Sequence, residues 1–293
     1  THENPGVLKN IANILMAGKL KGTGKMVVLP VDQGFEHGPA RSFAVNPDAY
    51  DPLYHPKLAI DAGLSAYAAP LGMLEMAAAN YPGAIPYILK MNSANSLVPS
   101  EGEPDQAMVG SVDDALRLGC SAIGFTIYPG SGNAFFMFEE VAELAREAKA
   151  KGLAVVVWSY PRGGDITKKG ETSLDVISYA AHIAALIGAN IIKVKPPAAD
   201  LEQDAAKKVY DKYHADMGQL KDRIAHIMQS SFDGKRLVVF SGGGAKDEAA
   251  LLTEIQQLQM GGASGSIIGR NVFQRPREEA LALLAQVIEI YRR

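Results

Sequence analysis

Lys193 is the residue in this chain whose type and position most clearly suit a chemical role. It lies near the end of the apolar run Ile191-Ile-Lys-Val-Lys195, where a buried strand would hold an amine away from water. Burial lowers the pKa of an ammonium group, and the neutral amine can attack a carbonyl carbon to form a Schiff base. A lysine at a strand end can instead extend its charge into solvent, so this run alone leaves both interpretations open.

Two other polar residues that follow apolar runs suit proton transfer. Asp32 could carry a proton as a carboxylate within reach of a substrate, or it could cap a helix or pair with an arginine. Tyr160 lies two residues after Trp158, so both side chains can face the same way at a strand end. Tyr160 would then donate or accept a proton beside a pocket wall formed by Trp158. The alternative is a core tryptophan and a hydrogen-bonded tyrosine at the rim.

Glycine turns after two further apolar runs predict a phosphate site. The turn in Phe240-Ser-Gly-Gly-Gly244 would expose backbone N–H groups beside a helix start, and Gly269-Arg270 would add a close backbone approach and a guanidinium. Glycine also serves tight turns with positive φ, so the first turn alone does not decide between the two roles. The pair of turns favours phosphate binding over a purely structural turn.

A metal site is disfavoured by the spacing of the candidate ligands. Asp32, Glu36 and His37 could be imagined as ligands, but no second histidine lies at a suitable spacing nearby. Three other histidines, His55, His182 and His226, are expected to be ordinary packing or surface side chains. The single cysteine, Cys120, is expected to be a small buried hydrophobic residue.

The elements that must position these residues form a regular alternation. Short apolar runs alternate with amphipathic segments, which is typical of parallel strands covered by helices. The predicted strands are residues 26–31, 65–69, 85–90, 122–125, 154–158, 191–195, 237–240 and 265–268. Helical patterns include residues 105–118, 138–150, 173–187 and 246–259.

Eight strands in this pattern predict an α/β fold with a single (β/α)8 TIM barrel, one domain over residues 1–293. A doubly wound sheet would need a Gly-x-Gly-x-x-Gly turn after an early strand, and the loop Asp32–Pro39 does not match it. Active sites of barrels lie at the carboxyl ends of the strands, so the scattered polar residues should converge there.

Two segments fall outside the alternation. Residues 6–17 predict a helix before the first strand, with Gly18 as its stop signal, and this helix could close the opposite end of the barrel. Residues 196–233 are mostly charged and helical in pattern, so we expect an enlarged insertion after the sixth strand that could cover the barrel mouth.

The composition excludes several classes of partner. A net charge of −3 with 21% charged residues offers no broad basic surface for nucleic acid or for anionic membranes. No apolar stretch is long enough to span a bilayer. A single cysteine cannot form an intrachain disulfide and fits a reducing cytoplasm.

These motifs together resemble the archaeal-type class I fructose-1,6-bisphosphate aldolases, a family also found in bacteria. The resemblance implies a (β/α)8 barrel, a Schiff-base mechanism that needs no metal or other cofactor, and a homo-oligomer, often a large ring such as a decamer. It runs through nearly the whole chain and rests on the stretches Leu29-Pro-Val-Asp-Gln-Gly-Phe-Glu-His-Gly-Pro39, Ala68-Ala-Pro-Leu-Gly-Met73, Ile123-Gly-Phe-Thr-Ile-Tyr-Pro-Gly130, Trp158-Ser-Tyr-Pro-Arg-Gly163, Ile191-Ile-Lys-Val-Lys-Pro-Pro197, Phe240-Ser-Gly-Gly-Gly244 and Gly269-Arg-Asn-Val-Phe273.

The resemblance also implies a substrate and roles for individual residues. Lys193 rather than Lys195 would form the Schiff base, because the family's reactive lysine follows an Ile-Ile pair. Tyr160 would transfer protons with the assistance of Asp32, while fructose 1,6-bisphosphate is cleaved reversibly to dihydroxyacetone phosphate and glyceraldehyde 3-phosphate. Lys90 and Lys195 would favour the neutral form of Lys193 by their charge. The implied substrate-binding residues are Trp158, Lys195, Lys90, His37, Ser241, Gly242, Gly243, Gly244, Gly269 and Arg270.

Two other functions remain open at this point. A sister aldolase or synthase could use the same imine on another phosphorylated ketose. A barrel without activity could bind a sugar phosphate as a sensor or scaffold.

Overall fold

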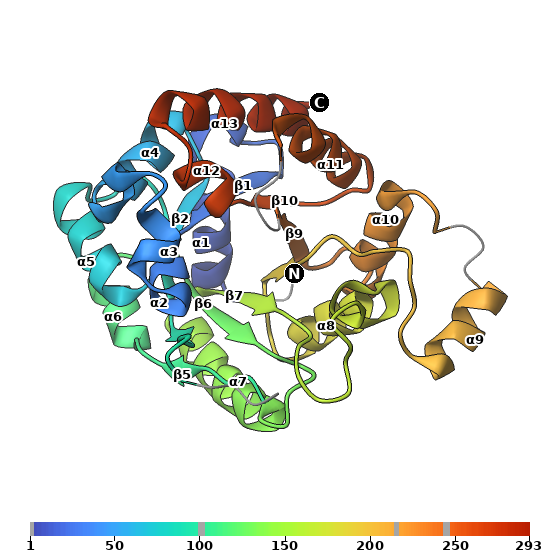
Figure 1. Cartoon of the computed structure of the whole chain (residues 1–293). Helices are drawn as coiled ribbons and strands as arrows, with labels where there is room; N and C mark the ends of the chain where they lie inside the picture. Colours follow the sequence, from blue (N-terminus) through green and yellow to red (C-terminus); the bar gives the residue numbers. More distant parts are fainter. Residues whose placement is uncertain (1–2, 99–102, 214–216, 243–246) are drawn as a thin grey trace.

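Parallel strands close into a barrel in the order β1-β10-β9-β8-β7-β6-β3-β2 (Figure 1). The structure, a computed structural model, describes residues 3–98, 103–213, 217–242 and 247–293. The predicted TIM barrel and each of its predicted strands are confirmed, with small shifts at the strand ends. The strands are β1 (Met26–Pro30), β2 (Ala66–Ala69), β3 (Tyr87–Lys90), β6 (Ala122–Ile127), β7 (Ala154–Ser159), β8 (Ile191–Val194), β9 (Leu237–Ser241) and β10 (Gly265–Ile267).

Helices follow the strands and form an outer ring around the barrel (Figure 1). Two predicted helices are confirmed as α7 (Ala134–Ala150) and α8 (Leu174–Leu186), and a third as α11 (Glu248–Met260), although its predicted first residue lies outside the described residues. Within the described ranges, no helix is both long enough and apolar enough to cross a membrane. The ring also contains α4 (Tyr54–Ala62), α5 (Leu71–Asn80), α6 (Val112–Arg117), α10 (Leu220–Ser230) and α13 (Arg277–Arg292).

The helix predicted over residues 105–118 begins later than expected. The side chain of Ser111 accepts a hydrogen bond from the Asp114 backbone, while the Asp114 carboxylate accepts one from the Ser111 backbone, and this capping box sets the start of α6. Before it, β5 (Ala107–Met108) pairs antiparallel with β4 (Asn92–Ser93). The prediction missed this ribbon because strands of two residues carry no hydrophobic periodicity.

The N-terminal helix closes the end of the barrel opposite the mouth, as expected. α1 (Pro5–Leu15) buries Val7 and Ile14 against the apolar side chains that fill the barrel interior. The Asn10 side chain donates a hydrogen bond to the carbonyl of Gly152, just before β7 begins, which places α1 at the amino ends of the strands. Figure 1 shows α1 behind the strands. The carboxyl ends are left for the site.

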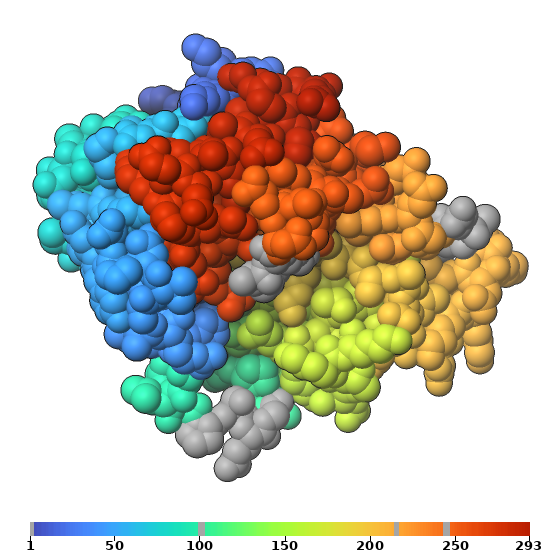
Figure 2. Space-filling view, turned by 45° about the horizontal axis from the view of Figure 1, so that its top comes forward, coloured from blue at the N-terminus to red at the C-terminus, as the bar shows by residue number. Residues whose placement is uncertain are grey.

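The insertion at residues 196–233 is confirmed, but the expectation that it covers the mouth is wrong. α10 packs in the outer ring between α8 and α11. α9 (Asp204–Tyr213) has no buried residue, and Figures 1 and 2 both place it at the periphery of the molecule. The charged side chains of α9 keep it in solvent, so it extends sideways from the barrel instead of folding over it.

Gly124 on β6 leaves the space that the Trp158 ring occupies. A Cβ atom at Gly124 would overlap this ring, which is only 1% exposed. We expect Gly124→Ala to lower the free energy of unfolding by about 1–3 kcal/mol, as overpacking does. Urea denaturation measures the change. Gly72→Ala on α5 is the matched control, because a Cβ there meets nothing within 4 Å. Equal stabilities of the two variants would refute the proposed steric role.

Candidate active site

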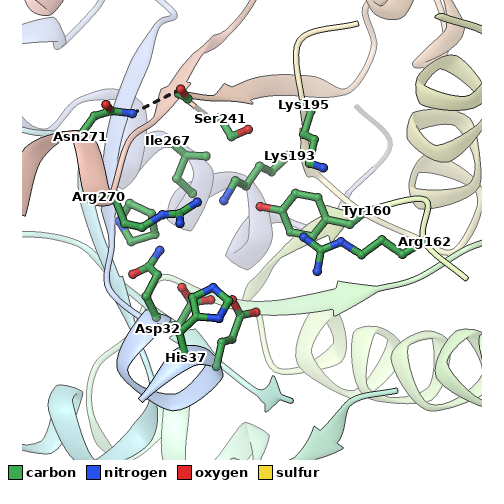
Figure 3. A pocket seen from close by; sticks show the side chains of 15 residues that line it. Asp32, His37, Tyr160, Arg162, Lys193, Lys195, Ser241, Ile267, Arg270 and Asn271 are labelled. Carbon is green, nitrogen blue, oxygen red and sulfur yellow. Dashed lines mark hydrogen bonds and ion pairs between the residues drawn. The ribbon is translucent and has the colours of Figure 1, made fainter. Parts of the chain in front are cut away.

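A cavity of about 230 Å³ opens at the carboxyl ends of the strands, where the barrel prediction placed the site. Figure 3 shows Lys193 near its centre, with residues from distant parts of the chain around it. The described residues that line the cavity are Pro30, Asp32, Gln33, Glu36, His37, Tyr160, Arg162, Lys193, Lys195, Ser241, Gly242, Ile267, Gly269, Arg270 and Asn271.

Lys193 projects from β8 into this cavity between two aromatic rings. Its side chain is buried, and its Nζ lies 5.6 Å from the centre of the Trp158 ring and 5.4 Å from that of Tyr160. The Tyr160 hydroxyl points toward Lys193 (Figure 3). The amine therefore reaches the cavity between two aromatic rings.

The pKa of the Lys193 amine is lowered to about 8. Burial is the main cause, and the positive charges of Lys90 and Arg270 act in the same direction, while the carboxylates of Asp32 and Glu36 oppose them. Near pH 8 about half of the amine is then neutral, because the two forms are equal at the pKa. A neutral, buried amine is what nucleophilic attack on a carbonyl requires.

Lys195 lines the same cavity but, unlike Lys193, forms an ion pair within the described residues. Its Nζ donates a hydrogen bond of 3.1 Å to the Glu171 carboxylate. Among the described residues, no ion pair is recorded for Lys193. The expected effect of Lys195 charge on the pKa of Lys193 is weakened by this pairing, because Glu171 offsets the charge.

Lys90 and Trp158 lie beneath the cavity lining. Both side chains are 1% exposed, and the Lys90 amine lies 5.8 Å from the centre of the Trp158 ring. Lys90 Nζ donates to the Asn92 carbonyl at 2.6 Å and lies 3.7 Å from the Asp32 carboxylate. From these positions they act on Lys193 through charge and packing, and their direct contact with a substrate stays a prediction.

Asp32 and Glu36 bring two carboxylates to one side of the cavity. Asp32 directly precedes α2 (Gln33–His37), which is separated from the end of β1 by two residues, and Glu36 follows one helical turn later on the same face. Burial and the negative charge of Asp32 raise the pKa of Glu36. The sequence suggested Glu36 only as a metal ligand, although its spacing from Asp32 indicated a shared face.

Tyr160 and Arg162 form the side of the cavity next to β7. Burial raises the pKa of Tyr160 well above its ordinary value, and the negative charges of Asp32 and Glu36 add to this effect. The phenol therefore keeps its proton at neutral pH and can donate it. Arg162 was not among the predicted site residues, and its position two residues after Tyr160 was the signal that could have identified it.

The end of β9 supplies one of the predicted phosphate-binding turns. Ser241, the last residue of β9, and Gly242 line the cavity, while Gly243 and Gly244 lie outside the described residues. The Asn271 side chain donates a hydrogen bond to the Gly242 carbonyl at 3.3 Å and so joins this turn to the next one (Figure 3).

The second predicted turn follows β10. A Cβ atom at Gly269 would lie 2.8 Å from the carbonyl oxygen of Pro30, so a side chain there would force the backbone apart. Gly269 leads into the short helix α12 (Arg270–Phe273), and both Gly269 and Arg270 line the cavity. Backbone N–H groups and a guanidinium at this edge match the chemistry of a phosphate group.

The histidines and the cysteine differ in their relation to the cavity. His37 lines it, and burial together with the charges of Arg270 and Arg41 lowers the pKa of His37. His55 is fully buried beside the Ala49 carbonyl, and Cys120 is buried as predicted. His182 and His226 lie between α8 and α10, away from the cavity. The described residues contain no group of three or more acidic, histidine or cysteine side chains that could hold a metal ion.

Lys90→Met should shift the pH dependence of imine formation at Lys193 to higher pH. The substitution removes a cation and leaves Asp32 and Glu36 less opposed, and both changes favour the protonated amine. The rate of borohydride trapping with dihydroxyacetone phosphate between pH 6 and pH 10 measures the shift. Lys168→Met is the control, because that side chain is 87% exposed. A profile that is the same in both variants would contradict the role of Lys90.

A closed parallel barrel that holds a buried amine of lowered pKa beside a protonated phenol defines a class of enzyme that works through a lysine imine. The chain belongs to the DeoC/LacD family of aldolases, whose family profile matches residues 26–275. This agrees with the resemblance found in the sequence motifs.

Two related proteins align with most of this chain. A Thermoproteus tenax protein named fructose-bisphosphate aldolase class 1 is 39% identical over 253 residues, which cover 86% of this chain and 84% of the relative. A Chlamydia trachomatis protein named probable fructose-bisphosphate aldolase class 1 is 34% identical over 98% of this chain and 85% of its own length.

A solved structure with a similar fold also comes from an aldolase. It is an archaeal fructose-1,6-bisphosphate aldolase with its catalytic lysine covalently bound to the carbinolamine intermediate of the substrate. It superposes on this barrel with a TM-score of 0.79 and 34% identity, over 96% of this chain and 98% of the solved chain.

Proposed function

We propose that this chain is a class I fructose-bisphosphate aldolase, which cleaves fructose 1,6-bisphosphate reversibly to dihydroxyacetone phosphate and glyceraldehyde 3-phosphate. The observation that carries the proposal is the Lys193 amine, which is buried at the barrel mouth with a pKa lowered to about 8. The named relatives and the solved aldolase with a lysine-bound intermediate support it.

In the proposed mechanism, Lys193 attacks the C2 carbonyl carbon of the open-chain ketose. The carbinolamine that forms loses water to give a protonated imine. This imine accepts the electron pair of the C3–C4 bond when that bond breaks, and glyceraldehyde 3-phosphate leaves. Protonation of the resulting enamine at C3 and hydrolysis of the imine release dihydroxyacetone phosphate and restore the free amine. The imine itself is the electron sink, so no metal or other cofactor takes part.

We assign the proton transfers to Tyr160 and Asp32. Tyr160 can first donate its phenol proton to the carbinolamine hydroxyl, which leaves as water. The phenolate then accepts the C4 hydroxyl proton during cleavage and returns a proton to C3 of the enamine. Asp32 assists the carbinolamine steps. Glu36, whose pKa is raised by burial and by the negative charge of Asp32, is a second carboxyl group beside Asp32.

The C1 phosphate is assigned to the edge of the cavity formed by β9 and β10. Arg270 supplies a cation there, and the backbone around Gly242 and Gly269 supplies close N–H groups. Gly243 and Gly244 would extend the same turn. His37, which also lines the cavity, would contact the sugar hydroxyls.

We further propose that the enzyme works in the cytoplasm, in glycolysis and gluconeogenesis, as a ring-shaped homo-oligomer such as a decamer. The single cysteine supports the reducing compartment. Phe135 and Phe136 at the start of α7 are 77% and 70% exposed, and adjacent exposed aromatic rings favour a subunit interface. Light scattering of the purified protein tests the assembly.

The test of the proposed activity compares phosphorylated ketoses in the presence of EDTA. We expect cleavage of fructose 1,6-bisphosphate that EDTA does not reduce, with both triose phosphates as products. Turnover of a different ketose phosphate without cleavage of the bisphosphate would assign the site to a sister aldolase or synthase. Binding without turnover of any ketose would indicate a sensor or scaffold.

A further inference from the structure

We propose that Glu171 is a positioning residue, which holds Lys195 and Arg162 so that their cationic groups anchor the second phosphate of the substrate. The inference rests on the proposed aldolase function and extends it to the end of the substrate that the glycine turns do not hold. Glu171 does not line the cavity, whereas Lys195 and Arg162 do.

Glu171 is placed behind the two cations by the loop between β7 and α8. It lies in the short 3-10 helix η3 (Gly170–Thr172) and is 8% exposed. Its Oε2 accepts a hydrogen bond from Lys195 Nζ at 3.1 Å and lies 4.0 Å from Arg162 Nε. One carboxylate oxygen therefore contacts both cations from the side away from the cavity.

The carboxylate is ionised at neutral pH, as this role requires. Burial alone would raise the pKa of Glu171, but hydrogen bonds and charges from Lys168 and Lys195 outweigh burial and lower it on balance. The set of Lys195, Arg162 and Glu171 carries two positive charges and one negative charge. A net positive charge thus remains at the cavity wall after the internal pairing.

The Tyr160 ring fixes the other side of both cationic groups. The Arg162 guanidinium lies 5.2 Å and the Lys195 amine 6.0 Å from the centre of this ring. Arg162 Nε is buried and has no hydrogen-bond partner among the described residues. Both groups are thus held between a carboxylate and an aromatic ring, which limits their conformations before a ligand binds.

The position of this cluster relative to Lys193 determines which phosphate it suits. Figure 3 shows Arg162 and Arg270 on opposite sides of Lys193. In a ketose bisphosphate bound as an imine at C2, one phosphate lies one carbon away and the other lies beyond the breaking bond, on the other side of the imine carbon. If Arg270 holds the first, the second extends toward Arg162 and Lys195. Arginine and lysine at this side match a phosphate dianion.

The experiment compares Glu171→Gln with the wild type on fructose 1,6-bisphosphate and on fructose 1-phosphate, which lacks the second phosphate. The substitution keeps the side chain's size and removes its charge. We expect the ratio of kcat/KM for the bisphosphate to that for the monophosphate to fall by about tenfold, mainly through KM, because the lost interaction is one of binding. A purely structural role would lower both values equally and leave the ratio unchanged, which would overturn the proposal.

Two further variants isolate the positioning role. Lys168→Met removes another partner of Glu171, at 2.9 Å but 87% exposed and outside the lining, and should leave the ratio unchanged. The double variant Glu171→Gln/Lys195→Met should lose less than the sum of the two single losses, because Glu171 acts in part through Lys195. Additive losses, or an equal loss in Lys168→Met, would contradict the proposal.

If Glu171→Gln does not fold, Glu171→Asp should lower the ratio by a smaller factor, and an unchanged ratio would overturn the proposal.

Failure of this inference is distinguishable from failure of the proposed function. If the wild type cleaves the bisphosphate and forms an imine with dihydroxyacetone phosphate, but the ratio is unaffected by Glu171→Gln, only the role of Glu171 is refuted. If the wild type shows neither cleavage nor imine, the aldolase function itself is refuted.

Discussion

Lys193→Met is expected to reduce turnover by at least about 10⁴-fold, because loss of a covalent nucleophile removes the main route of catalysis. Methionine matches the length of the lysine side chain without its amine, so the Trp158 and Tyr160 rings keep an apolar neighbour between them. Steady-state cleavage of fructose 1,6-bisphosphate measures the loss. Activity within about tenfold of the wild type would show that another group forms the intermediate.

The same variant should be more stable than the wild type at pH 7, by up to about 3 kcal/mol. The pKa of Lys193 falls from 10.5 to about 8 on folding, so the folded state binds fewer protons and gains stability as pH rises from 8 to 10.5. Below pH 8 the full cost of the buried charge is present, and methionine removes it.

Urea denaturation at pH 7 and at pH 10.5 checks this stability effect. The advantage of Lys193→Met should be largest at pH 7 and smaller at pH 10.5. Lys195→Met is the matched control, since it removes a paired charge and leaves Glu171 without that partner, so no gain is expected. A loss of stability in Lys193→Met at pH 7 would contradict the argument that burial of this charge is unfavourable.

Tyr160→Phe is expected to lower kcat by about 10²–10⁴-fold while imine formation with dihydroxyacetone phosphate persists. The phenol keeps its proton at neutral pH and points toward Lys193, so its loss affects the proton transfers of bond cleavage more than the attack of the amine. Stopped-flow cleavage and borohydride trapping measure the two steps separately.

Tyr128→Phe provides the comparison for Tyr160. Tyr128 is also a buried tyrosine near Arg162, with its ring centre 5.5 Å from the guanidinium, but its hydroxyl accepts a hydrogen bond from Gln106. It does not line the cavity around Lys193. A much smaller effect on kcat is expected. Equal losses in the two variants would show that the effect of Tyr160 is structural.

The barrel could be predicted from the sequence because its strands are buried on both faces. Runs such as Ala154–Trp158 need apolar side chains toward the barrel interior and toward the helices, so they appear in the sequence as continuous apolar stretches. Residues 92–93 and 107–108 are different. Their pairing follows from the chain geometry of one loop, and nothing in their composition distinguishes them from irregular segments.

The site was predictable where residues reach the cavity directly from strand ends. Lys193, Tyr160 and Asp32 follow apolar runs, so the barrel brings them to one cavity. Glu171 could not be found in this way, since it lies in a loop and reaches Lys195 only through the fold. The position of α9 could not be predicted from the sequence either. A charged helical pattern indicates that a helix is exposed to solvent, but not where the helix lies relative to the barrel.

The central claim is tested most directly by sodium borohydride reduction of the wild-type protein in the presence of dihydroxyacetone phosphate, followed by peptide mass mapping. The account predicts one reduced adduct, on the peptide that contains Lys193 and at that residue. An adduct on Lys195 or Lys90, or no adduct together with activity that EDTA abolishes, would contradict it.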